Sequence, residues 1–413
     1  MPNANINFNN IELLAPAGDL ESLESAIYFG ADAVYFAHKN FGMRANANNF
    51  DDDALKYAID YCHAHNKKAY ITCNIVIKNS DINELIEYLK LLEQLKPDAI
   101  ILCDPSVLLL AKQHAPSIAL HLSTQANTCN SLSANFWAGQ GIERIVVARE
   151  LSLTEIKSIK DSLPPYVELE AFVHGAMCVA YSGRCLISSF VSGRSANRGA
   201  CAQHCRYEYE IREKGYDENA GFLTLAQNSQ SAYVLNSKDL NSIAFLDKLV
   251  DSGITSFKIE GRAKAAYYVA NVVNVYRRAI DLLKKGNTQD VPQELQDELF
   301  KSAHRQYFSG FYFGDAKDSQ YLLASRPESE YQFVAKVVGH SGDKTQIQVR
   351  NKFEKNEILE VLSPTDNNNK TFKVGAMFNS KGLLIDTANK VKEVIELDLS
   401  LKLCVGDMLR KKA

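Results

Sequence analysis

Four of the nine cysteines lie within 28 residues of one another, at Cys178, Cys185, Cys201 and Cys205. Thiolates bind iron–sulfur clusters and zinc, and they also act as redox or nucleophilic groups. Structural zinc sites usually contain Cys-x-x-Cys pairs, and this group has none. The spacing favours a metal site over catalytic thiols and over simple packing, but it leaves both iron–sulfur and zinc open. The other five cysteines are scattered in or beside apolar runs, where we expect them to be buried.

The cysteine group lies in a positively charged stretch. Residues 171–207 contain no Asp or Glu, whereas they contain four arginines, among them Arg184 and Arg206. Arginine binds carboxylates and phosphates through two parallel hydrogen bonds, so the stretch predicts an anion site. Two alternatives are a solvated loop surface and a set of charges that offsets a negatively charged cluster.

Other polar residues follow predicted strands or stand beside short turns. These residues are Arg44, Gln125, Lys238, Lys258, Glu260 and Arg262. Lys258, Glu260 and Arg262 end the last predicted strand, where they would position an anion or move a proton. The alternative is an ion pair, Lys258–Glu260 or Glu260–Arg262, that only closes the structure.

The elements that would position these residues repeat one pattern, a short apolar run followed by a stretch of helical periodicity. Eight apolar runs occur, at 12–15, 33–36, 68–73, 99–103, 118–122, 144–147, 167–173 and 256–259. Helical patterns between them include 52–65, 82–95 and 153–163. Buried strands alternating with helices predict an α/β fold, a TIM-like (β/α)8 barrel. Because such barrels keep their active sites at the C-terminal ends of the strands, we expect the cysteine stretch at that face.

The predicted domains are a barrel over 1–262 with a Cys- and Arg-rich insertion at 175–250, a helical extension over 263–330, and a small C-terminal β-barrel over 331–413. Within the insertion we predict extra strands at 206–212 and 232–235. The extension should hold helices at 263–285 and 293–307. Alternating short strands from 333 onward predict the β-barrel.

Composition and charge exclude several classes of protein. The chain has 413 residues, of which 46% are hydrophobic and 23% charged, so it is neither disordered, collagen-like nor a coiled coil. Residues 331–413 hold 14 Lys and Arg against 10 Asp and Glu, a weak hint of a polyanionic partner. The longest apolar stretch, 99–111, is too short for a membrane span, and the first ten residues are not a signal peptide. We therefore expect a cytoplasmic protein with no membrane partner.

Familiar hydrolase motifs are missing. The chain has no His-Glu-x-x-His, Gly-x-Ser-x-Gly or phosphate-binding Gly-rich loop. A Cys–His peptidase built on Cys178 and His174 is conceivable, because the two residues are four positions apart.

Several motifs together resemble the collagenase-like peptidase family U32. The motifs are ELLAPAGD (12–19), GADAVY (30–35), HGAMC (174–178), SGRC (182–185), NRG (197–199), CAQHCR (201–206), NSKDL (236–240) and KIEGR (258–262). The resemblance covers nearly the whole chain. Better-understood members hydroxylate RNA bases or ubiquinone precursors, apparently without molecular oxygen, and carry a 4Fe-4S cluster on four cysteines.

The resemblance implies particular roles for this chain. Its length and C-terminal domain are similar to the branch that hydroxylates the wobble uridine of tRNA with prephenate, a small dicarboxylate, as co-substrate. The cluster ligands would be Cys178, Cys185, Cys201 and Cys205. We interpret Arg44, Arg184, Arg206 and Arg262 as anion contacts, and His174, Lys238 and Glu260 as groups that handle protons or orient the substrate.

Two other hypotheses remain at the level of the sequence. One is a metal- or thiol-dependent peptidase that acts on collagen-like substrates. The other is a non-catalytic module that binds RNA or protein and carries a structural metal.

Overall fold

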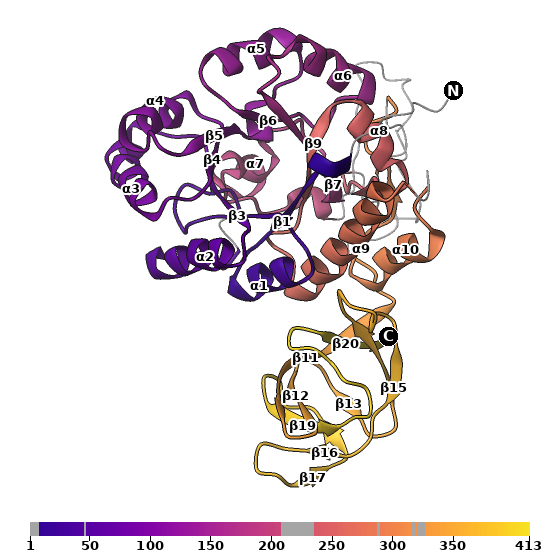
Figure 1. The fold of residues 1–413 in the computed structure, drawn as a ribbon. Helices are drawn as coiled ribbons and strands as arrows, with labels where there is room; N and C mark the ends of the chain where they lie inside the picture. The colour runs from indigo at the N-terminus through magenta and orange to yellow at the C-terminus, as the bar shows by residue number, and fades with distance from the viewer. Residues whose placement is uncertain (1–7, 45–46, 208–234, 287–289, 315–318, 321–326) are drawn as a thin grey trace, which may run out of the picture.

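The computed structural model describes residues 8–44, 47–207, 235–286, 290–314, 319–320 and 327–413, and its larger part is a closed parallel barrel (Figure 1). The barrel strands are β1 (Glu12–Pro16), β2 (Ala33–Phe36), β3 (Lys68–Cys73), β4 (Ala99–Leu102), β5 (Ala119–Leu122), β6 (Arg144–Val146), β7 (Glu168–Ala176) and β9 (Ile254–Ile259). Each strand corresponds to one of the predicted apolar runs. Pairing of β9 with both β1 and β7 closes the ring, which confirms the (β/α)8 prediction.

Helices surround the ring. They are α1 (Leu20–Tyr28), α2 (Asp52–Ala64), α3 (Ile82–Leu95), α4 (Pro105–His114), α5 (Ser131–Gly139), α6 (Leu153–Ser162), α8 (Leu246–Asp251) and α9 (Ala266–Lys284). Several begin at a side chain that accepts a hydrogen bond from the first turn, as Asp19 does for α1 and Ser152 for α6. These caps fix the residue at which the helix begins after the loop that follows the preceding strand. The helix predicted at 263–285 is α9, which packs against α1 and β1.

The predicted insertion begins where β7 runs past the rim of the barrel. The strand β8 (Asp239–Asn241) pairs antiparallel with the end of β7, and β10 (Tyr307–Phe308) pairs with β8. Between β7 and β8 lie the short helix α7 (Ile187–Ser192) and the 3-10 turns η4 (Ala196–Arg198) and η5 (His204–Arg206). The extra strands predicted at 206–212 and 232–235 lie almost wholly outside the described residues, and Arg206 is in a turn.

The helix predicted at 293–307 is shorter than expected. The structure has α10 (Gln293–Asp297), the 3-10 turn η7 (Glu298–Lys301) and then β10. Tyr307 and Phe308 pair with Asp239 and Leu240 of β8, so a contact from outside the segment determines its conformation. Helical periodicity cannot reveal such a contact.

The C-terminal domain is an antiparallel sheet that curls into a half-barrel (Figure 1). Its main strands are β11 (Tyr331–Ser341), β12 (Lys344–Val349), β14 (Ile358–Leu362), β15 (Thr371–Lys373), β16 (Met377–Phe378), β17 (Leu384–Ile385), β19 (Val394–Asp398) and β20 (Met408–Lys412). A separate pair joins β13 (Phe353–Glu354) to β18 (Thr387–Ala388). The domain has an apolar core of its own, which includes Val334, Ile347 and Leu397.

A buried arginine ties the two parts together. Arg410 of β20 is fully buried, and its guanidinium donates hydrogen bonds to Asn271 of α9 and to Glu298 of η7 at 3.0 and 2.7 Å. It also donates to Glu360 of β14. Among the described residues, no helix has the length and apolar character that a membrane crossing requires.

Candidate active site at the mouth of the barrel

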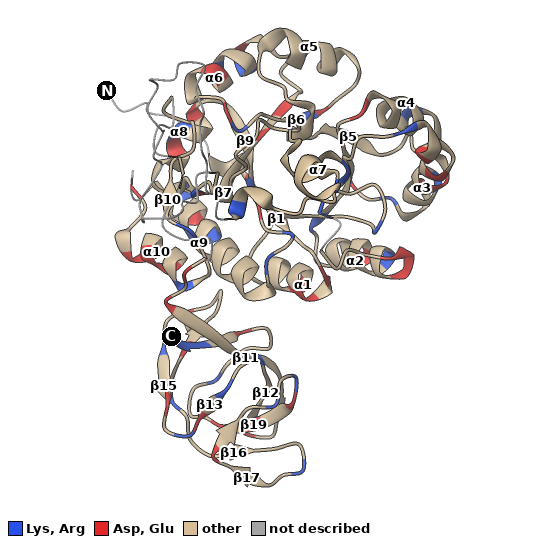
Figure 2. Cartoon of the chain, turned by 180° about the vertical axis from the view of Figure 1, so that it is seen from behind, with Lys and Arg blue, Asp and Glu red and all other residues tan. Residues whose placement is uncertain are grey.

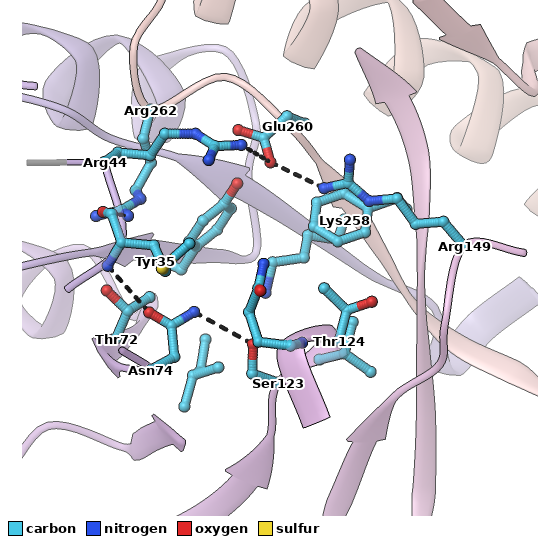
Figure 3. Close-up of a pocket in the computed structure, with 15 residues that line it drawn as sticks. Tyr35, Arg44, Thr72, Asn74, Ser123, Thr124, Arg149, Lys258, Glu260 and Arg262 are labelled. Atoms are coloured by element: carbon cyan, nitrogen blue, oxygen red, sulfur yellow. Dashed lines mark hydrogen bonds and ion pairs between the residues drawn. The ribbon is translucent and has the colours of Figure 1, made fainter. Parts of the chain in front are cut away.

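A polar pocket lies at the C-terminal ends of the barrel strands (Figure 3). Its lining comes from seven of the strands or the loops that follow them, and from Met43 and Arg44 after β2. The lining residues are Tyr35, Met43, Arg44, Thr72, Asn74, Ile101, Ser123, Thr124, Gln125, Val146, Arg149, Phe172, Lys258, Glu260 and Arg262. We call this the inner chamber. It lies at the face where barrel enzymes carry out their chemistry.

Glu260 lies at the centre of the arginines of the inner chamber. Its carboxylate is 3.0 Å from Nη2 of Arg149 and 3.6 Å from Nη2 of Arg44 (Figure 3). Burial would raise the pKa of Glu260, but Arg44, Arg149 and Arg262 together hold that pKa below its ordinary value. Glu260 is therefore ionised at neutral pH, which suits it to orient the arginines rather than to donate a proton.

Lys258 of β9 lines the chamber and forms an ion pair with a buried carboxylate inside the barrel. Its Nζ is 2.6 Å from Oε1 of Glu170 on β7 and 4.2 Å from the centre of the Tyr35 ring. Burial lowers the pKa of Lys258, and Glu170 opposes that effect. Neither ion pair considered from the sequence is the main one: Lys258 pairs with Glu170, and Glu260 pairs with Arg44 and Arg149.

Arg262 presents an unused donor to the inner chamber. Its side chain is buried, and Nη2 donates to the backbone oxygen of Met43. Its Nη1 has no hydrogen-bond partner among the described residues. Burial lowers the pKa of Arg262 to about 10, so it remains a cation at neutral pH. Gly18 packs directly on the backbone oxygen of Arg262, where a side chain would not fit.

The inner chamber therefore has a positive excess, which comes from its arginines because Glu170 balances Lys258. Its lining holds the four cations Arg44, Arg149, Lys258 and Arg262, and Glu260 is its one carboxylate. Asn74 fixes part of this arrangement, because it accepts a hydrogen bond from Met43 N–H and donates one to Ser123 Oγ, both at 3.2 Å. Such a pocket is suited to bind a small molecule with more than one negative charge.

A second pocket, the outer chamber, adjoins the first and carries the cysteines. Cys178, Cys185 and Cys201 line it, and it shares Arg44, Gln125 and Arg149 with the inner chamber. Gly183 holds the cysteine loop against the rim, because its φ is +73° and a Cβ there would collide with the backbone oxygen of Gln125. The loop and the inner chamber are therefore parts of one site.

The four cysteines are the type of ligand that an iron–sulfur cluster uses, but their side chains do not converge on one point in this structure. None of the four thiols forms a disulfide, and three share the outer chamber. Cys205 lies just beyond it, where burial raises the thiol pKa to about 11, Arg206 lowers that pKa and the other three thiols raise it. Within the described residues, no three Cys, His, Asp or Glu side chains converge closely enough to hold a metal ion. The chemistry of the donors fits a cluster, and their grouping at one chamber fits it as well.

Two of the predicted proton-handling residues do not reach either chamber. His174, near the end of β7, is buried against tyrosines of α9 and β10. Its ring nitrogens are 3.4 Å from the hydroxyl of Tyr276 and 3.5 Å from that of Tyr307. Burial lowers the pKa of His174 to about 3, so its ring is neutral. Both ring nitrogens face tyrosine hydroxyls, so His174 does not form a dyad with Cys178. Lys238 precedes β8, its backbone N–H donates to Ser319, and its side chain lines neither chamber.

The predicted arginines divide into two groups. Arg44 and Arg262 line the inner chamber, and the exposed Arg184 lines the outer one. Arg206 lines neither, because its guanidinium donates to Asn236 Oδ1, to the Ser237 oxygen and to the Met177 oxygen at 2.7, 2.6 and 2.6 Å. Arg206 thus holds the end of the cysteine loop against β7 and the segment before β8.

Arg149, one of the residues that line both chambers, was not among the site residues predicted from the sequence. Besides its contact with Glu260, it donates to the Ala176 oxygen at 3.0 Å and lies 3.9 Å over the Phe172 ring. It follows the sixth apolar run by two positions, so its place after a strand was the signal that could have identified it. Tyr35 was missed as well, because a tyrosine inside an apolar run is usually part of the core.

Comparisons with known proteins agree on the family of this chain. The model of "Peptidase family U32" matches residues 18–321, and that of "Peptidase family U32 C-terminal domain" matches residues 329–410. The tRNA hydroxylation protein P1 of Bacillus subtilis is 34% identical, over 97% of this chain and 94% of its own. The tRNA hydroxylation protein P of Escherichia coli is 35% identical, over 90% of each chain. A collagenase of Porphyromonas gingivalis is 34% identical, over 75% of each chain.

Proposed function

Because the chain belongs to peptidase family U32 and carries a cationic pocket beside a cysteine-lined chamber, we propose that it is a tRNA-modifying enzyme that hydroxylates the wobble uridine at C5. Two relatives that align over nine tenths or more of both chains are named tRNA hydroxylation proteins, which supports this assignment. The observation that carries it is the pair of adjoining chambers.

The inner chamber would bind the co-substrate, for which we propose prephenate. A dicarboxylate matches a pocket in which Arg44, Arg149 and Arg262 surround one fixed carboxylate. The unpartnered Nη1 of Arg262 is a donor that a ligand in the chamber could use. Glu260 holds Arg44 and Arg149 in place, so binding requires little rearrangement of the guanidinium groups.

The outer chamber would hold a 4Fe-4S cluster on Cys178, Cys185, Cys201 and Cys205. Replacing the C5 hydrogen of uracil by hydroxyl is a two-electron oxidation, so the co-substrate would have to accept the two electrons, and the bound cluster would supply the electron-transfer chemistry that acid–base side chains lack. Arg206 would orient the loop that carries Cys201 and Cys205, through its bonds to Asn236 and Met177. Arg149 and Gln125 would separate the two ligands, because both residues line both chambers.

One experiment tests this function directly. Protein purified without oxygen is mixed with unmodified tRNA, with or without prephenate, and the nucleosides are analysed by mass spectrometry. We expect 5-hydroxyuridine only with prephenate and only from protein that carries about four irons per chain. Iron-loaded protein that forms no hydroxyuridine but cleaves gelatin, and loses this cleavage in a Cys185→Ser variant, would support the peptidase hypothesis instead.

A further inference from the structure

An exposed apolar ridge stands on the cysteine loop. The ridge consists of Leu186, Phe190 and Val191, whose side chains are 55%, 80% and 56% exposed. Phe190 and Val191 belong to α7, whose other face is anchored: Ser188 is buried, and its Oγ accepts a hydrogen bond from Ala202 N–H at 3.0 Å. The anchoring keeps the ridge turned toward solvent.

The ridge lies at the entrance to the site. In Figure 2, α7 stands in front of the ring of barrel strands. Along the chain, the ridge is enclosed by Cys185 on one side and by Ala196 and Cys201 on the other, all of which line the outer chamber. Phe190 is therefore carried by the same short segment as three residues of the outer chamber.

The segment that carries the ridge is rich in arginine and has no acidic residue of its own, and the carboxylates that contact the segment, Asp81 on Arg198 and Glu150 on Ser182, come from other loops. Residues 171–207 lack acidic side chains, and the exposed Arg184 and Arg194 precede and follow the ridge along the chain. Arg194 is held in place, because its Nε donates to the Ala200 oxygen at 3.1 Å. An aromatic ring with arginines beside it is the arrangement on which proteins stack unpaired bases while binding the phosphates of the same strand.

We propose that the ridge is a stacking platform for an unpaired nucleobase of a single-stranded RNA loop, with Phe190 as the base-contacting residue and Arg184 and Arg194 as phosphate contacts. This inference rests on the proposed function, which requires a base of a structured RNA to enter the site. A nucleobase next to the target would stack on Phe190 and hold the loop over the chambers. Because every base has an aromatic face, this contact contributes affinity without sequence specificity.

The test measures equilibrium binding of an RNA hairpin with a single-stranded, uridine-containing loop. In Phe190→Ala we expect the Kd to rise roughly 5- to 150-fold, which corresponds to the range for loss of one stacked base. Phe190→Trp should retain binding, whereas Phe190→Leu should lose it, because leucine keeps the apolar bulk without the aromatic face. Arg194→Ala should also weaken binding and should reduce the salt dependence of the Kd.

A matched control is available on α5, where Phe136 is 61% exposed and no basic residue belongs to the helix. Phe136→Ala should leave the Kd of the hairpin unchanged. Unchanged RNA binding by Phe190→Ala, or equal loss in Phe136→Ala, would overturn the proposal. Retained binding by Phe190→Leu would overturn stacking as its basis and leave an apolar surface for a protein partner.

The outcome is separable from that of the proposed function. Wild-type protein that forms 5-hydroxyuridine while Phe190→Ala binds the hairpin normally contradicts only the platform. Wild-type protein that forms no 5-hydroxyuridine, but binds the hairpin through Phe190, contradicts only the hydroxylase.

Discussion

Lys258 Nζ lies 2.6 Å from Glu170 Oε1 inside the barrel, and this pair connects the inner chamber to a buried ionic network. Glu170 is fully buried, and its other oxygen lies 3.4 Å from Nη1 of Arg144. Arg144 also contacts Glu12, which closes the barrel across β1. The base of the chamber is therefore a chain of alternating charges rather than an apolar layer.

Replacing Glu170 by Gln should strongly destabilise the protein. Lys258 would remain buried without its carboxylate, and breaking such a pair typically costs ~3–5 kcal/mol. The pKa of Lys258 is already lowered by burial, and without Glu170 it should fall further. A folded-state pKa below the unfolded one means that the unfolded chain binds more protons, so stability rises with pH in that window. The loss of unfolding free energy in Glu170→Gln, relative to wild type, should thus shrink as the pH rises from neutral toward the ordinary pKa of lysine.

Urea unfolding at several pH values measures this effect. Glu168→Gln is the matched control, because Glu168 also pairs with Arg144 but is 49% exposed. Loss of the Glu168 carboxylate should lower the free energy of unfolding by about 1 kcal/mol or less. Equal losses in the two variants would contradict the central role of the Lys258–Glu170 pair.

Arg149→Ala should weaken binding of prephenate. The variant removes a charged donor from the shared wall of the two chambers, and such bonds contribute about 1.5–3 kcal/mol, or roughly a 10- to 150-fold rise in Kd. Arg149→Lys should restore little of the affinity for prephenate, because lysine lacks the planar guanidinium group that binds a carboxylate through two hydrogen bonds. Isothermal titration calorimetry gives the Kd values. Lys157→Ala, an exposed change on α6, should bind like wild type, and a normal Kd in Arg149→Ala would remove this residue from the anion site.

Single Cys→Ser changes at positions 178, 185, 201 and 205 should each lower the iron content below about four per chain, because a cluster needs all four thiolates. Iron and sulfide are counted after purification without oxygen. Cys404→Ser changes an exposed thiol of the C-terminal domain, and it should keep full iron. A variant among the four that keeps its full cluster would show that another residue is a ligand.

His174→Phe should retain activity, which tests the earlier expectation that His174 handles protons. The ring lies among Tyr268, Tyr276 and Tyr307, outside both chambers. Loss of a general acid or base lowers the rate by about 100-fold or more, whereas a packing change does not. A loss of that size in kcat, with an altered pH profile and normal folding, would restore the catalytic role.

Stability gives a second readout for the same variant. The pKa of His174 is about 3 in the folded protein, against an ordinary value of 6.5. As the pH falls between those values, protons bind only the unfolded state, so the wild type loses stability there. His174→Phe should lose less stability over this interval in urea unfolding.

The local sequence determined the barrel and the residues at its mouth. The chain has eight apolar runs of strand length, separated by segments of helical periodicity. This pattern favours a parallel sheet that closes on itself and is covered by helices on its outer face. Polar residues placed directly after those runs must then meet at one rim. Arg44, Glu260 and Arg262 could be grouped in this way, although more than 200 residues separate Arg44 from the other two.

Only the tertiary structure determined which charges pair and which way side chains face. Strand periodicity would turn His174 inward with Glu170 and Phe172, but the pairing of β7 with β9 shifts register between Phe172 and His174. Beyond that irregularity, His174 packs against the tyrosines instead of the pocket. Arg206 likewise found a partner in the segment before β8, and Lys258 found one on β7, both distant in sequence. Periodicity records burial along one strand, whereas ion pairs and register depend on distances between strands, which no single segment of the sequence contains.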